Sequence, residues 1–123
     1  MSNEEFSEIT AVFEENLKKA LTEFLVLQMI SERDYYIGEL STAIHERSGK
    51  VLSIIFPYSA IYRLVDRGDI FECGKRHAPD GRRRQYYRIT EQGKRYMAQL
   101  RATYDRFFGG VEKVLNGQPG SEG

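Results

Sequence analysis

The sequence predicts a mainly α-helical chain with one small β-hairpin, on the basis of two observations. Four stretches repeat apolar residues at the three- and four-residue spacing of an amphipathic helix. Between the third and the fourth stretch lie two short runs rich in Ile, Phe and Tyr, which are separated by a turn sequence. With 123 residues, of which 41% are hydrophobic and 29% charged, the chain has the length and composition of one globular domain.

The first three helices are expected in the N-terminal half of the chain. Spaced apolar residues predict a first helix over residues 7–31 and a second over residues 35–47, with Asp34 as the cap of the second. Gly49 marks the end of this second helix. Because proline is tolerated only near the start of a helix, the third helix is placed at residues 57–67.

The two short apolar runs predict a hairpin over residues 69–90. The sequence HAPDGRR between them, residues 77–83, suits a turn in which Gly81 adopts a left-handed conformation. Successive residues of a strand point to opposite faces, so we expect one of Tyr86 and Tyr87 to be buried and the other exposed.

A fourth helix is predicted over residues 91–116, with Thr90 as its cap and a flexible tail at residues 117–123. Its apolar residues are spaced 3, 4, 3, 4 and 3 apart, as in a helix that packs along another helix. This seam is longer than a small core needs, so we expect a second copy of the chain to cover it. The residues predicted for dimerisation, two of them on the first helix, are Phe13, Leu17, Met97, Leu100, Tyr104, Phe107, Val111 and Val114.

The charge of the chain is balanced in total but not in distribution. There are 18 basic and 18 acidic residues, yet residues 1–34 carry 3 basic and 8 acidic groups, and residues 75–96 carry 8 basic and 2 acidic groups. Local fields, rather than net charge, attract a polyanion at short screening lengths. The hairpin region is therefore the segment expected to meet phosphate.

The predicted order of three helices followed by a hairpin with a basic tip is that of a winged helix-turn-helix domain. In such a domain the third helix enters the major groove of DNA, and the hairpin, called the wing, contacts the backbone beside it. Tyr62 has an alternative position in the core, because it adjoins apolar residues. The residues predicted to contact DNA are Tyr58, Ser59, Tyr62, Arg63, Lys75, Arg76, Arg82, Arg83 and Arg84.

The chain resembles the PadR-like family of transcriptional regulators from about Leu21 to Gly117. The resemblance is carried by YYIGEL (residues 35–40), IYRLVDRGDI (61–70), GRRRQYYRITEQGKRYM (81–97) and VEKVLNG (111–117). It implies a homodimeric DNA-binding repressor in which the last helix, with help from the first, forms the dimer.

The chain departs from the family at the start of the recognition helix. The family usually has Gly-Thr-Leu-Tyr there, and this chain has Ser59, Ala60, Ile61 and Tyr62. Base preference therefore cannot be transferred from the family, whereas phosphate contacts depend less on these positions.

Several other classes of function lack support in the sequence. No set of nucleophile, base and orienting group suggests an enzyme, and the single Cys73 with two separated histidines gives no metal-ligand spacing and no cofactor motif. The acidic N-terminus and the absence of a long apolar run predict a cytoplasmic protein without membrane contact.

Two alternatives concern the partners. The basic wing would equally suit a winged-helix protein-interaction module that recruits an acidic protein. The aromatic residues of the first and last helices could line a pocket for a small hydrophobic effector at the dimer interface, or could form an ordinary closed interface.

Overall fold

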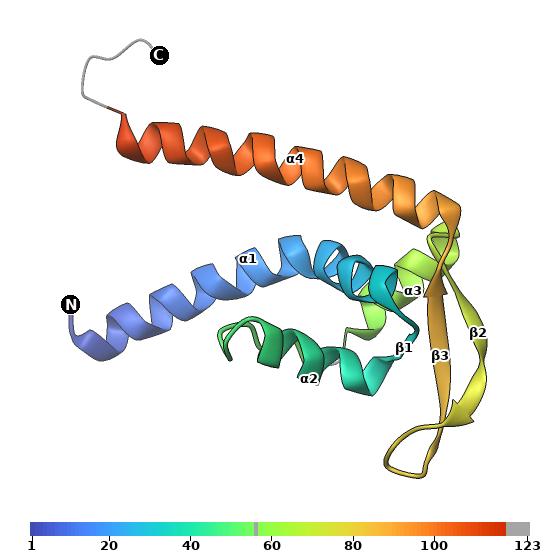
Figure 1. Cartoon of the computed structure of the whole chain (residues 1–123). Coiled ribbons are helices and arrows are strands. Elements are labelled where there is room, and N and C mark those ends of the chain that lie inside the picture. The colour runs from blue at the N-terminus through green and yellow to red at the C-terminus, as the bar shows by residue number, and fades with distance from the viewer. Residues whose placement is uncertain (56, 118–123) are drawn as a thin grey trace.

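A computed structural model of the chain describes residues 1–55 and 57–117, which form four helices and a three-stranded antiparallel sheet (Figure 1). The helices are α1 (Asn3–Glu32), α2 (Ile37–Arg47), α3 (Tyr58–Arg67) and α4 (Glu91–Asn116). The strands are β1 (Tyr35–Tyr36), β2 (Ile70–His77) and β3 (Arg83–Ile89). The predicted fold class is confirmed, and the predicted bounds of the last helix match those of α4. The predicted tail beyond Gly117 lies outside the described residues.

The starts of α1 and α2 differ from the prediction. α1 begins earlier because the Ser2 Oγ accepts a hydrogen bond from the backbone N–H of Glu5 at 3.2 Å. α2 begins later, and the assignment of Asp34 as its cap was wrong. Tyr36 occupies the cap position, and its backbone N–H donates to the Glu39 carboxylate at 3.3 Å.

The sheet has a third strand that the sequence did not predict. β3 lies in the centre, with β2 on one side and the two-residue β1 on the other, where Tyr35 pairs with Tyr87 and Tyr36 with Tyr86. The expectation that one of Tyr86 and Tyr87 would be exposed was wrong, because both are buried. Tyr87 faces the core, while Tyr86 is covered by the ring of Tyr36 at 5.5 Å and by the guanidinium of Arg76 at 4.3 Å.

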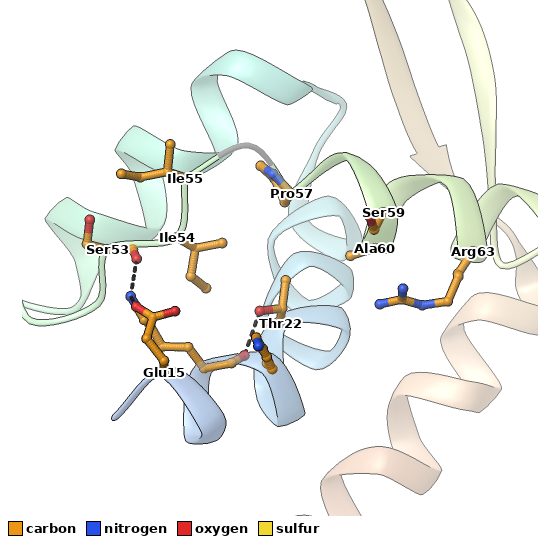
Figure 2. A pocket seen from close by; sticks show the side chains of 11 residues that line it. Glu15, Thr22, Ser53, Ile54, Ile55, Pro57, Ser59, Ala60 and Arg63 are labelled. Carbon is orange, nitrogen blue, oxygen red and sulfur yellow. Dashed lines mark hydrogen bonds and ion pairs between the residues drawn. The ribbon is translucent and has the colours of Figure 1, made fainter. Parts of the chain in front are cut away.

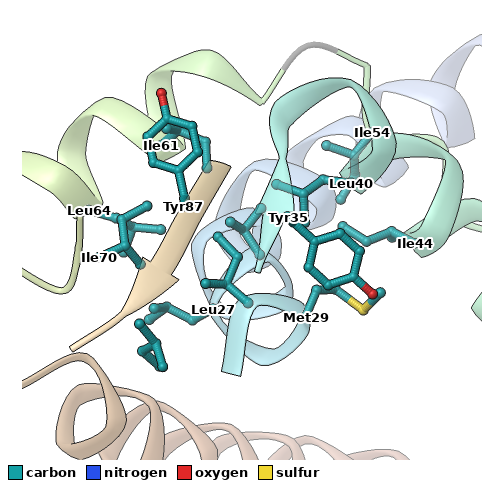
Figure 3. Packing of buried hydrophobic residues seen from close by; sticks show 13 residues of the cluster. Leu27, Met29, Tyr35, Leu40, Ile44, Ile54, Ile61, Leu64, Ile70 and Tyr87 are labelled. Atoms are coloured by element: carbon teal, nitrogen blue, oxygen red, sulfur yellow. The ribbon is translucent and has the colours of Figure 1, made fainter. Parts of the chain in front are cut away.

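The hydrophobic core lies between the C-terminal half of α1, α2, α3 and the sheet (Figure 3). Its fully buried members come from helices and from the start of β2. They include Val26, Leu27, Leu40, Ile61, Leu64 and Ile70. The first turns of α4 cover one side of this core through Met97 and Leu100, which are half-buried against it.

A buried carboxylate joins the end of α3 to the start of α4. Asp69 accepts a hydrogen bond from Nε of Arg67 at 2.9 Å and another from Nε2 of Gln92 at 3.1 Å. As predicted, Thr90 caps α4: its Oγ1 accepts from the backbone N–H of Gly93 at 3.0 Å. The direction in which α4 leaves the domain is therefore fixed by contacts with the end of α3.

Two long segments project from this core on the same side of the molecule. Figure 1 shows that the N-terminal part of α1 and the C-terminal part of α4 extend together, while the β2–β3 hairpin points in another direction. Gly109 and Gly110 lie within the continuous α4. In the part of the chain that the structure describes, no helix is both long and apolar enough to cross a membrane.

Candidate nucleic-acid interface

Helix α3 presents one face to the core and another to solvent. Ile61 and Leu64 are fully buried, and Gly68 ends the helix in a left-handed conformation with φ 81°. Tyr62 is 62% exposed, so the alternative of a core position does not apply to it. Ser59 is also exposed. The helix predicted to read DNA therefore has a free outward face.

Arg63 lies on the flank of α3 that faces α1. Its side chain is about half exposed, and its Nε is 3.6 Å from the Glu23 carboxylate. Tyr62 precedes Arg63 and is therefore about 100° away around the helix. Its ring packs on that of Tyr58, with 6.4 Å between the centroids. The two side chains thus leave the exposed face of α3 in different directions.

The turn of the wing has the geometry that its sequence predicts. The backbone N–H of Gly81 donates to the Ala78 carbonyl at 2.8 Å, and Gly81 has φ 82°. Asp80 accepts hydrogen bonds from the backbone N–H of Arg82 at 3.0 Å and from the guanidinium of Arg84 at 3.1 Å. These donors lower the pKa of Asp80.

The predicted DNA-contacting residues of the wing divide into two groups. Lys75, Arg82 and Arg83 are exposed and form no salt bridge with any described residue. Arg84 and Arg76, by contrast, already have carboxylate partners within the protein. The first group is free to meet phosphate without breaking an ion pair.

Asp34 connects both strands of the wing to the end of α1. Its Oδ1 and Oδ2 accept hydrogen bonds from Arg88 at 2.9 and 2.8 Å, and Oδ2 also accepts from Arg76 at 2.6 Å. The guanidinium of Arg88, helped by that of Arg76, holds the pKa of Asp34 well below its usual range. Asp34 was missed as a site residue because its partners lie 42 and 54 positions further along the chain.

The residues predicted for dimerisation fall into an inner and an outer set. Met97 and Leu100 pack against the chain's own core, and Tyr104 contacts Phe24 of α1 with 5.8 Å between ring centroids. Leu17 is exposed at 38%, and Val111 is half-buried. The outer set is Phe13, Phe107 and Val114, which are 65%, 60% and 82% exposed.

The described residues contain no group of three His, Cys, Asp or Glu side chains placed to hold a metal ion. Cys73 is a free, half-buried thiol that accepts a hydrogen bond from Arg76 at 3.2 Å. The exposed surface of α3 and the wing carries cations and hydroxyls, together with the carboxylates of Asp66, Glu72 and Asp80. The cations and hydroxyls are groups that bind phosphate oxygens.

A helix-turn-helix whose second helix is exposed, followed by a basic two-stranded wing, defines a DNA-binding winged-helix protein. The model of the transcriptional regulator PadR-like family matches residues 26–99, and the chain belongs to this family. The match covers the end of α1, then α2, α3 and the sheet, and the first two turns of α4.

Known proteins agree with this assignment. A transcriptional regulator from Clostridium thermocellum is 26% identical, with a TM-score of 0.69 over 80% of this chain and 96% of that one. A PadR family transcriptional regulator from Eggerthella lenta, 22% identical, shares the fold with a TM-score of 0.77 over 92% of this chain and 97% of that one. An uncharacterized protein of Lysinibacillus sphaericus is 31% identical over 77 residues, which are 62% of this chain and 71% of that protein. The family and both of these solved structures are described as transcriptional regulators.

Proposed function

We propose that the chain is a transcriptional repressor that binds pseudo-palindromic DNA as a homodimer. The observation that carries the proposal is the exposed face of α3 beside a wing in which the side chains of Lys75, Arg82 and Arg83 form no salt bridge with any described residue. Two copies related by a two-fold axis would place two such surfaces on half-sites about 34 Å apart, or a multiple of this distance. A dimer bound across a promoter would then repress by blocking access to it.

The exposed apolar surface of α1 and α4 supports the homodimer. Phe13 on α1, and Phe107 and Val114 on α4, lie on the two segments that project together from the core (Figure 1). Leaving three such side chains in water is unfavourable by roughly 1.5–3 kcal/mol for each large apolar group. Covering them with the same segments of a second copy removes this cost and gives the two-fold symmetry that a pseudo-palindrome needs. An effector site at this interface stays a prediction.

The proposal can be tested by fluorescence anisotropy with DNA fragments from the region upstream of the chain's own gene. If about four phosphates are neutralised per subunit, the slope of log K against log salt should be about −3.6 per subunit. Replacing both Arg82 and Arg83 by alanine should make this slope less steep by about 1.8 per subunit. Arg84→Ala is the matched control, because Arg84 is already paired with Asp80 and should contribute less.

Affinity that does not depend on salt, or that is unchanged in the Arg82 and Arg83 variant, would contradict the proposal. A protein partner that is retained after nuclease treatment, together with the absence of DNA binding, would instead favour a protein-interaction module.

A further inference from the structure

An open groove of about 780 Å³ lies between α1 and the start of α3 (Figure 2). One wall is formed by residues 15–22 in the middle of α1, and another by Ser59 and Arg63 of α3. Residues 53–55, which precede α3, close the end of the groove through Ser53, Ile54 and Ile55. The recognition helix is therefore itself part of the groove.

The lining of the groove carries an excess of positive charge, because it contains three cations and a single carboxylate. Lys18 has partners within the protein: its Nζ donates to the Ser53 carbonyl at 2.8 Å and pairs with Glu15 at 2.5 Å. Arg63 pairs weakly with Glu23 across 3.6 Å. Lys19 is exposed, and its side chain forms no hydrogen bond or salt bridge with any described residue.

No residue of the wing lines the groove, which is bounded by α1, residues 53–55 and the start of α3. Arg63 of α3 lines the groove, across from Lys18 and Lys19 of α1. A helix with its side chains is about 10–12 Å wide and fills a major groove of about 12 Å, so the phosphate backbones of the two strands pass along both of its flanks. The wing can contact the backbone on one flank, which leaves the other flank to α1.

The first turn of α3 adds to the positive potential of this flank. Pro57, at the N-cap position, has no side chain that could accept a hydrogen bond from the turn. The start of a helix carries a partial positive charge that favours a nearby anion. This potential adds to that of Lys18 and Lys19 across the groove.

We propose that this groove receives the DNA backbone on the side of α3 that faces α1, with Lys19 as the principal phosphate contact. Lys18 and Arg63 strengthen the local field, and Glu15 weakens it by pairing with Lys18. This inference rests on the proposed function and extends the DNA surface from α3 and the wing to α1. In this proposal the groove binds the phosphodiester groups of the DNA backbone. The alternative ligand with the same chemistry is a free phosphate-like anion.

The decisive variant is Lys19→Ala in the full chain, measured by anisotropy with the same upstream DNA. Loss of one phosphate contact per subunit should reduce the salt slope by about 0.9 per subunit and weaken affinity on the order of tenfold for a dimer. Lys113→Ala is the matched control, since Lys113 is an exposed lysine near the far end of α4 and should leave both quantities unchanged.

A second variant predicts a change in the opposite direction. Glu15→Gln releases Lys18 from its carboxylate and removes the negative charge from the groove, so DNA affinity should rise several-fold and the salt slope should become steeper. A purely structural role of these side chains would not produce opposite effects in the two variants.

A titration with inorganic phosphate at constant ionic strength tests whether the groove binds a free anion instead. The amide NMR shifts of Lys19 and Ser59 report binding in the groove. Phosphate-dependent shifts combined with unchanged DNA affinity of Lys19→Ala would overturn the assignment to DNA. If the Arg82 and Arg83 variant loses DNA affinity as expected but Lys19→Ala does not, the role of the groove in DNA binding is overturned. The proposed function then remains intact. Absence of DNA binding by the unmodified protein would overturn both.

Discussion

Gly93 allows α4 to begin against the end of α3. A Cβ atom at this position would clash with the carbonyl oxygen of Asp69 and would lie 2.8 Å from the side chain of Ile89. Both neighbours belong to well-packed backbone or core and cannot move away cheaply. Gly93→Ala should therefore lower the free energy of unfolding by about 2–3 kcal/mol, measured by urea denaturation.

Gly109 is the matched control for this prediction. Apart from the neighbouring backbone of α4 itself, no described residue lies within 4 Å of a Cβ built on Gly109, which is also inside α4. Gly109→Ala should raise the free energy of unfolding by about 1 kcal/mol, because alanine has the higher helix propensity. Equal effects of the two substitutions would show that close packing at Gly93 is not what requires a glycine there.

Asp34 makes the attachment of the wing dependent on pH. A carboxyl group whose pKa is lower in the folded than in the unfolded state contributes stability that is complete above its unfolded pKa, about 3.9. The contribution is then lost as pH falls through the lower, folded pKa. At pH 7, Asp34→Asn should lower the free energy of unfolding by about 1 kcal/mol, because solvent screens the partly exposed Arg76 and Arg88.

Urea denaturation at pH 7 and at pH 3 tests this prediction. The difference between Asp34→Asn and the unmodified protein should become smaller at pH 3, where the contribution of Asp34 is partly lost. Asp105→Asn, which breaks an exposed pair with Arg101 on α4, should have a smaller effect at pH 7. A difference that stays constant between the two pH values would contradict the role of the Asp34 carboxylate.

The elements that the sequence predicts well are those determined by local patterns. Periodic apolar residues, Thr90, Gly68 and the turn before Gly81 were enough to place α3, α4 and the wing. The short strand β1 could not be found in this way. Its two residues form a strand only by pairing with Tyr86 and Tyr87, which are 50 or more positions away.

The candidate site shows the same division between local and distant contacts. Sequence reasoning identified the exposed arginines of the wing, because a turn with clustered charge is a local feature. It gave no indication that Asp34 would hold Arg76, or that Lys19 would lie across a groove from Ser59. These relations depend on how α1 packs against α3 and against the wing, which no short stretch of sequence encodes.

At the scale of the whole molecule, α1 contributes both to the hydrophobic core and to the exposed apolar surface. Its C-terminal half contributes Val26 and Leu27 to the core, whereas its N-terminal half exposes Phe13. Replacing both Phe13 and Phe107 by aspartate should give a monomer at micromolar concentration, because charges would be placed in the apolar surface proposed for dimerisation. Light scattering gives the mass directly.

Phe71→Asp is the control for the dimer prediction, since Phe71 is an exposed aromatic residue on β2, outside α1 and α4. This variant should remain a dimer. The Phe13 and Phe107 variant should also bind operator DNA more weakly, because the second half-site no longer benefits from a linked recognition helix. A monomeric unmodified protein, or a dimer that survives both aspartates, would contradict the assignment of the interface.

The order of the strands in the sheet also affects the tendency of the protein to aggregate at high concentration. Because β3 is central, the long open edge belongs to β2, and an open edge is a template on which other chains can add strands. The pairing of β2 with β3 is irregular between Glu72 and Gly74, and Gly74 has φ 125°. The exposed Lys75 follows this irregularity. A kinked and charged edge resists strand addition, so the hairpin that is proposed to contact DNA is also protected against self-aggregation.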